Sequence, residues 1–352
     1  MKDLPSINAL KSGWYGPSSA YTPEHFAWAF LEREPEPCLL MGVEDGQKLV
    51  GTQAVLPIPC RQGETAWRSC KSEETLLDPE YRGKGLFNRL YDEIFSRIDD
   101  RIDVIWGETG AGKAFERCGF STPATMRYTV AFTGPPTREF PLGEEAKTSG
   151  QRFKRRLFAI AHRLLRYKTA LMLRWTKRDP EVVEDMSLAF YEAAWDRMTR
   201  QYPRLLSVDR TQAWLRWRLE KNPNNRYRML RLADGEDIGA LLFLTDESNR
   251  IVFLVDFVAA GNVESIARRL AGELAAIAAG EGLSLIIDLA LDVDLAPQRA
   301  RQKALRRFGS LSVPMPGLVF VRRLSPRFDP DDPRFDAQNW YYTYLMSDGS
   351  RV

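Results

Sequence analysis

The residues best suited to chemistry form a short loop of two glycines and two basic residues, Arg82-Gly83-Lys84-Gly85. This loop follows a strand predicted to end near Pro79 and opens a helix predicted over residues 84–98. The first backbone N–H groups of a helix have no partner within the helix, and the helix dipole favours negative charge there. Glycines let a bulky anion approach the backbone closely. The spacing therefore predicts a binding site for a pyrophosphate or similar anion.

Carboxylates dominate the remaining candidates, because histidine and cysteine are scarce. The chain has two histidines and four cysteines in 352 residues, and no cysteine pair has the spacing of a zinc site. This composition argues against a metal centre, a His-based triad or a disulfide scaffold. Glu73 and Glu74 are adjacent on the strand before the loop, so only one of them is expected to face a cleft beside that strand. Glu108 follows the next predicted strand.

The elements that must position these residues indicate a mixed α/β fold. Leu86, Leu90, Ile94 and Ile98 belong to one apolar stripe with helical period, which predicts the helix over 84–98. Antiparallel hairpins followed by alternating strands and helices predict a mixed sheet flanked by helices. The other predicted strands lie near residues 49–57, 66–77, 102–107, 124–132, 227–233, 237–245, 250–258, 283–290, 317–323 and 339–346, and the other helices near 111–118, 263–280 and 297–308.

Two short matches within the chain predict an internal duplication. Residues 25–52 align without gaps onto residues 213–240, a spacing of 188, and pair Leu31 with Leu219 and Gly51 with Gly239. Residues 112–123 likewise resemble residues 302–314. At about 100–200 residues per domain, the length also suggests two domains or three. We expect domains at residues 1–143 and 185–352, joined by a basic helical linker at residues 144–184.

Charge is concentrated in one segment of that linker. The net charge is +3, but residues 151–178 contain ten Lys or Arg and no Asp or Glu. Apolar residues at helical spacing predict an amphipathic helix, which packs against a domain, meets an anionic substrate or partner, or lies on a membrane surface. The basic charge is not spread over a surface as in DNA-binding proteins, so no nucleic-acid partner is expected. Without a signal peptide or an apolar run of about 20 residues, a cytoplasmic location is expected.

The loop and the elements around it resemble the GNAT N-acetyltransferase superfamily. Residues Arg82 to Phe87 resemble its acyl-CoA signature R/Q-x-x-G-x-G/A, although Phe87 stands where Gly or Ala is usual. Phe115 to Phe120 occupy the position of the family's YEKLGF segment. The resemblance covers residues 20–132 and, through the repeat, more weakly residues 187–346. It implies two GNAT-like domains, each a mixed, mostly antiparallel sheet flanked by helices, of which the second is degenerate.

The resemblance also implies where an acyl-CoA would bind. In this family the fourth and fifth strands splay apart, and the pantetheine arm lies in the gap like an extra strand. The strand backbone would bond the pantetheine, and the amides of the loop would hold the pyrophosphate. The implied acyl-CoA-binding residues are Leu76, Leu77, Asp78, Arg82, Gly83, Lys84, Gly85, Leu86, Phe87 and Phe115.

Catalytic roles follow from the same resemblance. Glu73 stands where some GNAT enzymes carry a glutamate base, and Glu108 borders the acceptor cleft of the fold. Phe115 replaces the family's tyrosine, which protonates the departing thiolate. A thiolate with a pKa near 8.5 can leave largely unassisted, and Cys118, Tyr81 and Tyr128 are the substitute donors to consider. No metal is implied.

The second half lacks the anion loop, because residues 259–265 contain one glycine and no basic residue. We therefore expect it to support the first domain and to wall the acceptor pocket, with the aromatic run at residues 339–344 either reaching that pocket or forming an edge strand. The leading hypothesis is an acyltransferase that moves an acyl group, most simply acetyl, from acyl-CoA to a small amine such as an amino sugar or an amino-acid-derived metabolite. The alternatives are a regulatory module that binds acyl-CoA without turnover and an aminoacyl-tRNA-dependent ligase.

Overall fold

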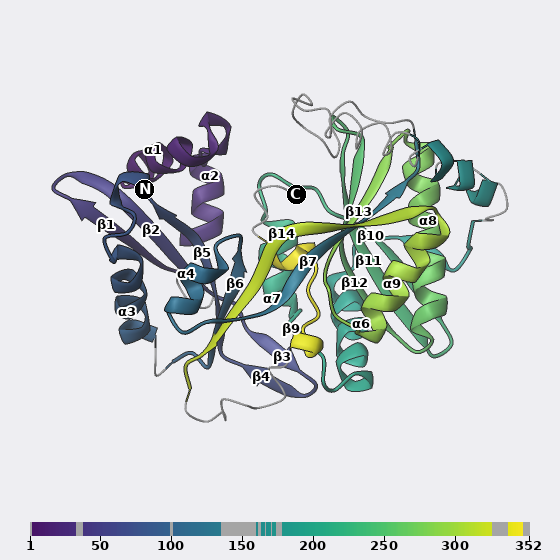
Figure 1. The fold of residues 1–352 in the computed structure, drawn as a ribbon. Helices are drawn as coiled ribbons and strands as arrows, with labels where there is room; N and C mark the ends of the chain where they lie inside the picture. The colour runs from purple at the N-terminus through teal and green to yellow at the C-terminus, as the bar shows by residue number, and fades with distance from the viewer. Residues whose placement is uncertain are drawn as a thin grey trace. The chain divides into compact units, whose positions relative to one another are not determined.

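The computed structural model describes residues 2–32, 38–98, 101–134, 178–325 and 337–347, with short helical pieces at residues 160, 163–165, 167–169 and 171–173. Figure 1 shows the ribbon. The chain forms two compact units, each assembled from separate segments. Unit 1 comprises Met1–Thr125, Leu206–Asn225 and Pro316–Trp340, and unit 2 comprises Met126–Leu205, Arg226–Met315 and Tyr341–Val352.

Unit 1 is built on a sheet of order β1-β2-β5-β6-β14. Its pairs are antiparallel except for β5 and β6, which are parallel. The strands are β1 (Leu39–Asp45), β2 (Lys48–Pro57), β5 (Ser69–Leu77), β6 (Val104–Thr109) and the part of β14 (Ser310–Arg323) that follows Met315, and a smaller sheet contains β4 (Thr65–Trp67), β3 (Cys60–Gln62) and β9 (Leu206–Val208). The helices are α1 (Leu4–Tyr15), α2 (Pro23–Phe26), α3 (Leu86–Ile98), α4 (Gly112–Arg117) and α7 (Gln212–Leu215).

Unit 2 repeats this plan with the order β7-β13-β12-β11-β10-β8. Here β12 and β13 form the parallel pair. The strands are the part of β7 (Ser121–Phe132) from Met126 onward, β13 (Leu285–Leu291), β12 (Ile251–Ala260), β11 (Asp237–Asp246), β10 (Arg228–Asp234) and β8 (Val182–Glu184). The helices are α6 (Leu188–Gln201), α8 (Val263–Gly280) and α9 (Ala296–Arg307), and α8 and α9 lie side by side in Figure 1. Apolar faces of α8 and α9 pack with β10 to β13 in one core.

Each unit takes one strand from the other half of the sequence. In unit 2, β7 pairs antiparallel with β13, from Leu285 with Phe132 to Leu291 with Met126. In unit 1, β14 pairs with β6, from Leu318 with Thr109 to Arg323 with Val104. The compact units therefore differ from the consecutive domains expected at residues 1–143 and 185–352, because strand pairing joins segments that are distant in sequence.

Similar local structures recur within the two aligned ranges, and the first part of them has a spacing of 189 residues. Trp28 and Trp217, 189 residues apart, stack with ring centroids 5.0 Å apart, and each indole N–H donates to the other's carbonyl at 2.9 and 3.0 Å. Helix caps and two-residue hairpin turns follow this spacing, with Thr22 matching Thr211 and Gly46 matching Gly235. Gly51 and Gly239 keep the expected spacing of 188, because they pair with the equivalent residues Val43 and Leu232 and the first hairpin has a register shift between Val43 and Glu44.

The mixed α/β class and most predicted elements are confirmed, including α3 with Leu90, Tyr91, Ile94 and Ile98 buried. The strand predicted over residues 339–346 is wrong. That segment contains two short 3-10 turns, Ala337–Asn339 and Tyr344–Met346, with an isolated bridge at Trp340. Its side chains from Trp340 to Met346 are buried, so an apolar run there reflects burial on several sides rather than a strand face. Most of the basic segment at residues 151–178 lies outside the described residues.

Candidate functional site

The parallel strands β5 and β6 of unit 1 part shortly after they begin to pair. They pair from Ser69 with Val104 to Lys71 with Trp106. Beyond that point β5 continues against β2 as far as Leu77, and β6 continues against β14 as far as Thr109. We call the opening between residues 72–77 and 107–109 the unit 1 fork. Its inner end is tight, because a Cβ on Gly107 would lie 2.8 Å from the Ser72 carbonyl oxygen.

A bulge shapes the β5 side of this fork. The register between β2 and β5 shifts between Thr52 and Ala54, and Glu74 adopts a φ of 51°, a left-handed conformation that is uncommon outside glycine. The Gln53 amide holds the bulge, donating to the Glu73 carbonyl at 3.0 Å and to Ser72 Oγ at 2.9 Å. The fork backbone is therefore fixed by buried side-chain hydrogen bonds.

The bulge also decides which backbone groups face the fork. Asp78 N–H donates to the Val50 carbonyl at 2.8 Å, so alternation along the pair turns the backbone of Leu77 and Thr75 away from β2. The Leu77 carbonyl accepts from the Trp14 indole at 3.1 Å, which leaves its N–H for a ligand. Leu76 faces β2, with which it pairs at Thr52. Both backbone groups of Asp78 are bonded within the unit, because its N–H donates to the Val50 carbonyl and its carbonyl accepts from the Tyr81 N–H.

The loop after β5 has the geometry of an anion site. Gly83 and Gly85 have φ values of 73° and 76°, and a Cβ on either would meet nothing within 4 Å. The first bond of α3 runs from Arg89 N–H to the Gly85 carbonyl at 3.2 Å. Geometry therefore leaves the N–H groups of Leu86 and Phe87 outside the helical ladder, ready for a ligand. Open space, free backbone amides and the helix dipole together suit a pyrophosphate.

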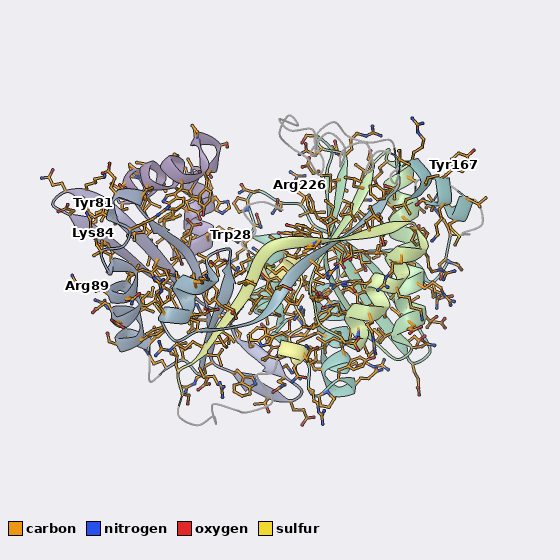
Figure 2. The ribbon with its side chains drawn as sticks, viewed as in Figure 1. Trp28, Tyr81, Lys84, Arg89, Tyr167 and Arg226 are labelled. Carbon is orange, nitrogen blue, oxygen red and sulfur yellow. The ribbon has the colours of Figure 1, made fainter. Side chains whose placement is uncertain are left out.

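Aromatic rings steady the basic side chains beside the loop. The Arg82 guanidinium lies 4.0 Å from the centre of the Trp14 ring, and Lys84 Nζ lies 4.4 Å from that of Tyr81. Figure 2 shows Tyr81, Lys84 and Arg89 along one edge of unit 1. Tyr81 donates to Asp45, and that bond raises the pKa of the phenol. A tyrosine bonded to Asp45 at this edge is poorly suited to protonate a thiolate in the fork.

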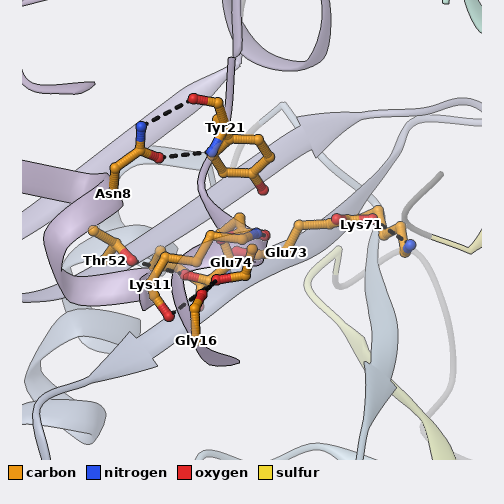
Figure 3. A network of polar contacts seen from close by, with 10 residues as sticks. Asn8, Lys11, Gly16, Tyr21, Thr52, Lys71, Glu73 and Glu74 are labelled. Carbon is orange, nitrogen blue, oxygen red and sulfur yellow. Dashed lines mark hydrogen bonds and ion pairs between the residues drawn. The ribbon is translucent and has the colours of Figure 1, made fainter. Parts of the chain in front are cut away.

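The two glutamates of β5 are both held by lysines. Lys71 pairs with Glu73, and its Nζ lies 3.9 Å from Glu108 Oε1, while Lys11 Nζ lies 2.7 Å from Glu74 Oε1. Lys71 is 1% exposed, whereas the Glu73 and Glu108 side chains are 10% and 21% exposed. Figure 3 shows Lys11 and Lys71 on either side of the adjacent glutamates. The structure thus brings the two predicted catalytic carboxylates, Glu73 and Glu108, to one ammonium group.

Phe115, which replaces the tyrosine proton donor implied by the resemblance, lies in an aromatic cluster. Phe115 is 3% exposed and stacks on Phe320 with ring centroids 3.9 Å apart. Phe87 meets it edge-on at 5.2 Å, and Tyr91 does so at 5.6 Å. Phe115 and Phe87 therefore shape the wall of the fork through packing rather than through polar contact. Burial raises the pKa of Cys118 to about 11, consistent with a structural thiol.

Sequence reasoning missed Lys71, Ser72 and Tyr91. Lys71 lies two residues before Glu73 and so shares its strand face, which is a signal that the sequence does contain. Ser72 and Tyr91 come together only through the packing of α3 on β5, where their oxygens lie 2.7 Å apart. Their meeting depends on tertiary structure, and no spacing along the chain shows it.

Unit 2 opens an equivalent fork but fills it with its own side chains. Strands β12 and β13 pair as far as Leu254 with Asp288 and then part. Arg301 of α9 bonds Asp288 Oδ2 at 3.1 Å and the Leu289 carbonyl at 3.3 Å, and Tyr341 donates to the Phe257 carbonyl at 2.5 Å. Arg301 also donates to the Tyr341 oxygen at 2.9 Å. Two backbone carbonyls beside this opening, those of Leu289 and Phe257, are thus already bonded.

Metal-binding clusters and membrane-spanning helices are not found in the described residues. No group of three or more His, Cys, Asp or Glu side chains there is arranged to hold a metal ion. In the same part of the chain, none of the helices is both long and apolar enough to cross a membrane.

Comparison with known proteins agrees with this geometry. A protein-family model described as an acetyltransferase (GNAT) domain matches residues 4–122. No match is found among curated proteins. A solved structure of a probable N-acyltransferase of unknown function from Enterococcus faecalis is similar over 92% of this chain and 70% of its own, with 10% identity and a TM-score of 0.59.

Two further solved structures are similar at comparable distance. A GCN5-related N-acetyltransferase from Anabaena variabilis matches 92% of this chain and 71% of its own, with 11% identity and a TM-score of 0.58. Saccharomyces cerevisiae N-myristoyltransferase with bound myristoyl-CoA matches 98% and 82%, with 13% identity and a TM-score of 0.55. At such identities these likenesses show the fold, while the family model confirms the resemblance carried by residues 82–87.

Proposed function

We propose that this chain, whose residues 4–122 match a GNAT acetyltransferase domain, transfers an acetyl group from acetyl-CoA to a small amine, such as an amino sugar or an amino-acid-derived metabolite. The observation that carries the proposal is the unit 1 fork, which leads directly into the Arg82–Gly85 loop. One end offers strand backbone to a pantetheine arm, and the other offers helix amides to a pyrophosphate.

The dimensions of the fork suit this donor. From Ser72 to Leu77 the strand advances five residues, or about 17 Å, a length that an extended pantetheine arm can cover. A donor bound with its pyrophosphate on the loop would place its thioester near Ser72, at the inner end. That end is closely packed, since a Cβ on Gly107 would also lie 2.4 Å from the Phe320 ring. Tight packing there supports a short acyl group such as acetyl.

Glu73 is the proposed base for the amine. An amine attacks a thioester only in its neutral form, so a carboxylate acting directly or through water must accept its proton. The Lys71 ammonium pairs with the Glu73 carboxylate, and the Gln53 bond to the Glu73 carbonyl fixes the backbone that carries it. Glu108, near the same lysine, is proposed to contact the acceptor.

Calorimetric titration and a thiol-release assay test the proposal together. We expect acetyl-CoA to bind with micromolar affinity, and to bind at least as well as a long-chain acyl-CoA. Addition of glucosamine or an α-amino amide is expected to accelerate release of free CoA thiol, with one N-acetylated product formed per thiol. Absence of binding by acetyl-CoA, free CoA and the long-chain acyl-CoA would refute the donor assignment. Binding without amine-dependent release would refute the transfer.

A further inference from the structure

The acyl transfer proposed above expels a thiolate, and the fork wall that packs on α3 contains two buried hydroxyl groups. Ser72 is the first β5 residue beyond the last β5–β6 pair, and it is 4% exposed. Its Oγ lies 2.7 Å from the phenolic oxygen of Tyr91, which is fully buried. Phe115, which contacts the Tyr91 ring, has no proton to give.

These hydroxyls lie on the opposite face of the sheet from the carboxylates. Cys70 packs in the cluster that contains Tyr91, Ile94 and Phe115, and Ser72, two residues further along β5, bonds Tyr91 on that face. Lys71 and Glu73 alternate with Cys70 and Ser72 and so face the other side. An amine that gives its proton to Glu73 would therefore approach the thioester from one face, while the sulfur is accessible from the other.

The hydrogen bonds of this group allow two arrangements of its protons. The Gln53 amide donates to Ser72 Oγ at 2.9 Å, and Gln53 Oε1 accepts from Thr75 Oγ1. In one arrangement Ser72 donates to Tyr91, and Tyr91 donates to Gln53 Oε1 at 3.1 Å. In the other, Tyr91 donates to Ser72. Both lone pairs of Ser72 are then occupied, so its own proton must point to a third partner, while Gln53 Oε1 keeps the Thr75 bond.

From this network we infer that Ser72 is the proton donor to the departing CoA thiolate and that Tyr91 supplies Ser72 through a relay. The inference rests on the proposed acyl transfer. As the amine nitrogen bonds the carbonyl carbon, the C–S bond breaks and its electron pair passes to sulfur. Sulfur takes the Ser72 proton while Ser72 takes the Tyr91 proton. The proton released by the new amide nitrogen passes through Glu73 to solvent. Once CoA has left the fork, Ser72 takes a proton from water there and passes it to the buried Tyr91, so that the relay is restored and the step balances.

Steady-state kinetics of Ser72→Ala and Tyr91→Phe, measured by CoA thiol release with acetyl-CoA and glucosamine, test the relay. Positioned acids contribute about 100-fold to 10,000-fold, and because a thiolate is a fair leaving group we expect kcat to fall by about 10-fold to 100-fold. The KM for acetyl-CoA and its calorimetric Kd should stay within about twofold, since Ser72 contributes to proton transfer and not to the pyrophosphate contact. The double variant should be no slower than the slower single variant, because both belong to one relay.

Ser69→Ala is the matched control. Ser69 is also a buried serine of β5, but it precedes the fork and donates to the Ile58 carbonyl. Its loss should lower the melting temperature and leave kcat unchanged. Equal kcat in wild type and Ser72→Ala would overturn the relay while the acyl transfer stands. Multiplicative losses in the double variant would overturn it too. Wild-type protein that binds acetyl-CoA and turns over no amine would overturn the proposed function, and the relay with it.

Discussion

Unit 1 and unit 2 contain the same fork between two parallel strands, and they differ in what occupies it. In unit 1 the fork is bordered by backbone groups of Thr75 and Leu77 and leads to a loop with two glycines at positive φ. In unit 2 Arg301 and Tyr341 bond the carbonyls of Leu289 and Phe257 beyond the last strand pair. The second fork thus has two backbone carbonyls bonded by its own side chains, whereas the first leaves the Leu77 N–H for a ligand.

The loops at the mouths of the two forks differ in the same sense. Gly261 and Asn262 precede α8, and the Asn262 side chain caps the Ser265 N–H at 3.1 Å. Asp237 accepts from the Asn262 N–H, and a Cβ on Gly261 would lie 2.3 Å from an Asp237 oxygen. An anion at this loop would be repelled by the Asp237 carboxylate and would find the Ser265 N–H already bonded by Asn262. The Arg82–Gly85 loop instead offers positive charge and open space. We therefore expect acyl-CoA to bind in unit 1 alone.

Reversing the charge of the unit 1 loop should have the largest effect. In Arg82→Glu combined with Gly85→Asp, a carboxylate replaces the cation, and a side chain is forced into a left-handed position that costs about 1–2 kcal/mol. We expect the affinity for acetyl-CoA to fall by more than about 100-fold, as two or more charge-assisted hydrogen bonds are lost. Calorimetry measures it, and circular dichroism checks the fold.

The matching change in unit 2 is Asn262→Asp. It also adds a carboxylate at the start of a helix, at the cap of α8. Because aspartate is as good a cap as asparagine, the fold should remain and the acetyl-CoA affinity should not change. A loss of binding in this variant, or its retention in the unit 1 variant, would reverse the assignment of the two forks.

Within unit 1 the next effect concerns the two adjacent glutamates. Glu73→Gln removes the proposed base and should lower kcat by about 100-fold to 10,000-fold with little change in the Kd of acetyl-CoA. Glu74→Gln is the control, since Glu74 pairs with Lys11 of α1 rather than with Lys71. It should lower the melting temperature by leaving a buried ammonium without its carboxylate, while kcat changes far less. An equal fall of kcat in both variants would contradict the assignment of Glu73, and not Glu74, as the base.

The sequence was informative where chemistry depends on local pattern. The apolar stripe of α3 and the loop before it follow from periodicity and glycine spacing, so both were predictable. The exchange of β7 and β14 between the units was not, because a strand's pattern shows which face is buried and not which strand lies beside it. The bulge at Glu74 could not be predicted from the sequence either, because it too depends on a neighbouring strand. The left-handed conformation of Glu74 has no compositional signature, and the Gln53 amide that fixes the bulge comes from another strand and bonds the Glu73 carbonyl.

The approach of Lys71 to both Glu73 and Glu108 likewise became clear only from the structure. Lys71 could have been placed on the face of Glu73 from its spacing, but its approach to Glu108 depends on the β5–β6 register. The aromatic run ending at Tyr344 resembles a strand in sequence, because alternating and continuous apolar patterns look alike over a few residues. Tyr341 instead reaches the unit 2 fork from an irregular segment.

The smallest expected effect concerns the filled fork of unit 2. Burial raises the pKa of Asp288 to about 6, against the attraction of Arg301, and Asp256 nearby adds a second negative charge. A folded-state pKa above the unfolded value of about 3.9 means that the folded state holds this proton more tightly. The contribution of Asp288 to stability is therefore complete below about pH 4 and is lost as the pH rises through about 6.

Urea unfolding between pH 4 and pH 7 tests this in Asp288→Asn against wild type. Asparagine does not titrate, so the difference in unfolding free energy between the two proteins should change with pH in the direction that disfavours wild type at the upper end. Asp292→Asn, on an exposed carboxylate bonded to Arg127, is the control and should give a nearly constant difference. A constant difference for Asp288→Asn as well would mean that Arg301 keeps Asp288 charged throughout. The filled fork would then be a fully ionised buried network, and its contrast with unit 1 would rest on Tyr341 and the occupied carbonyls alone.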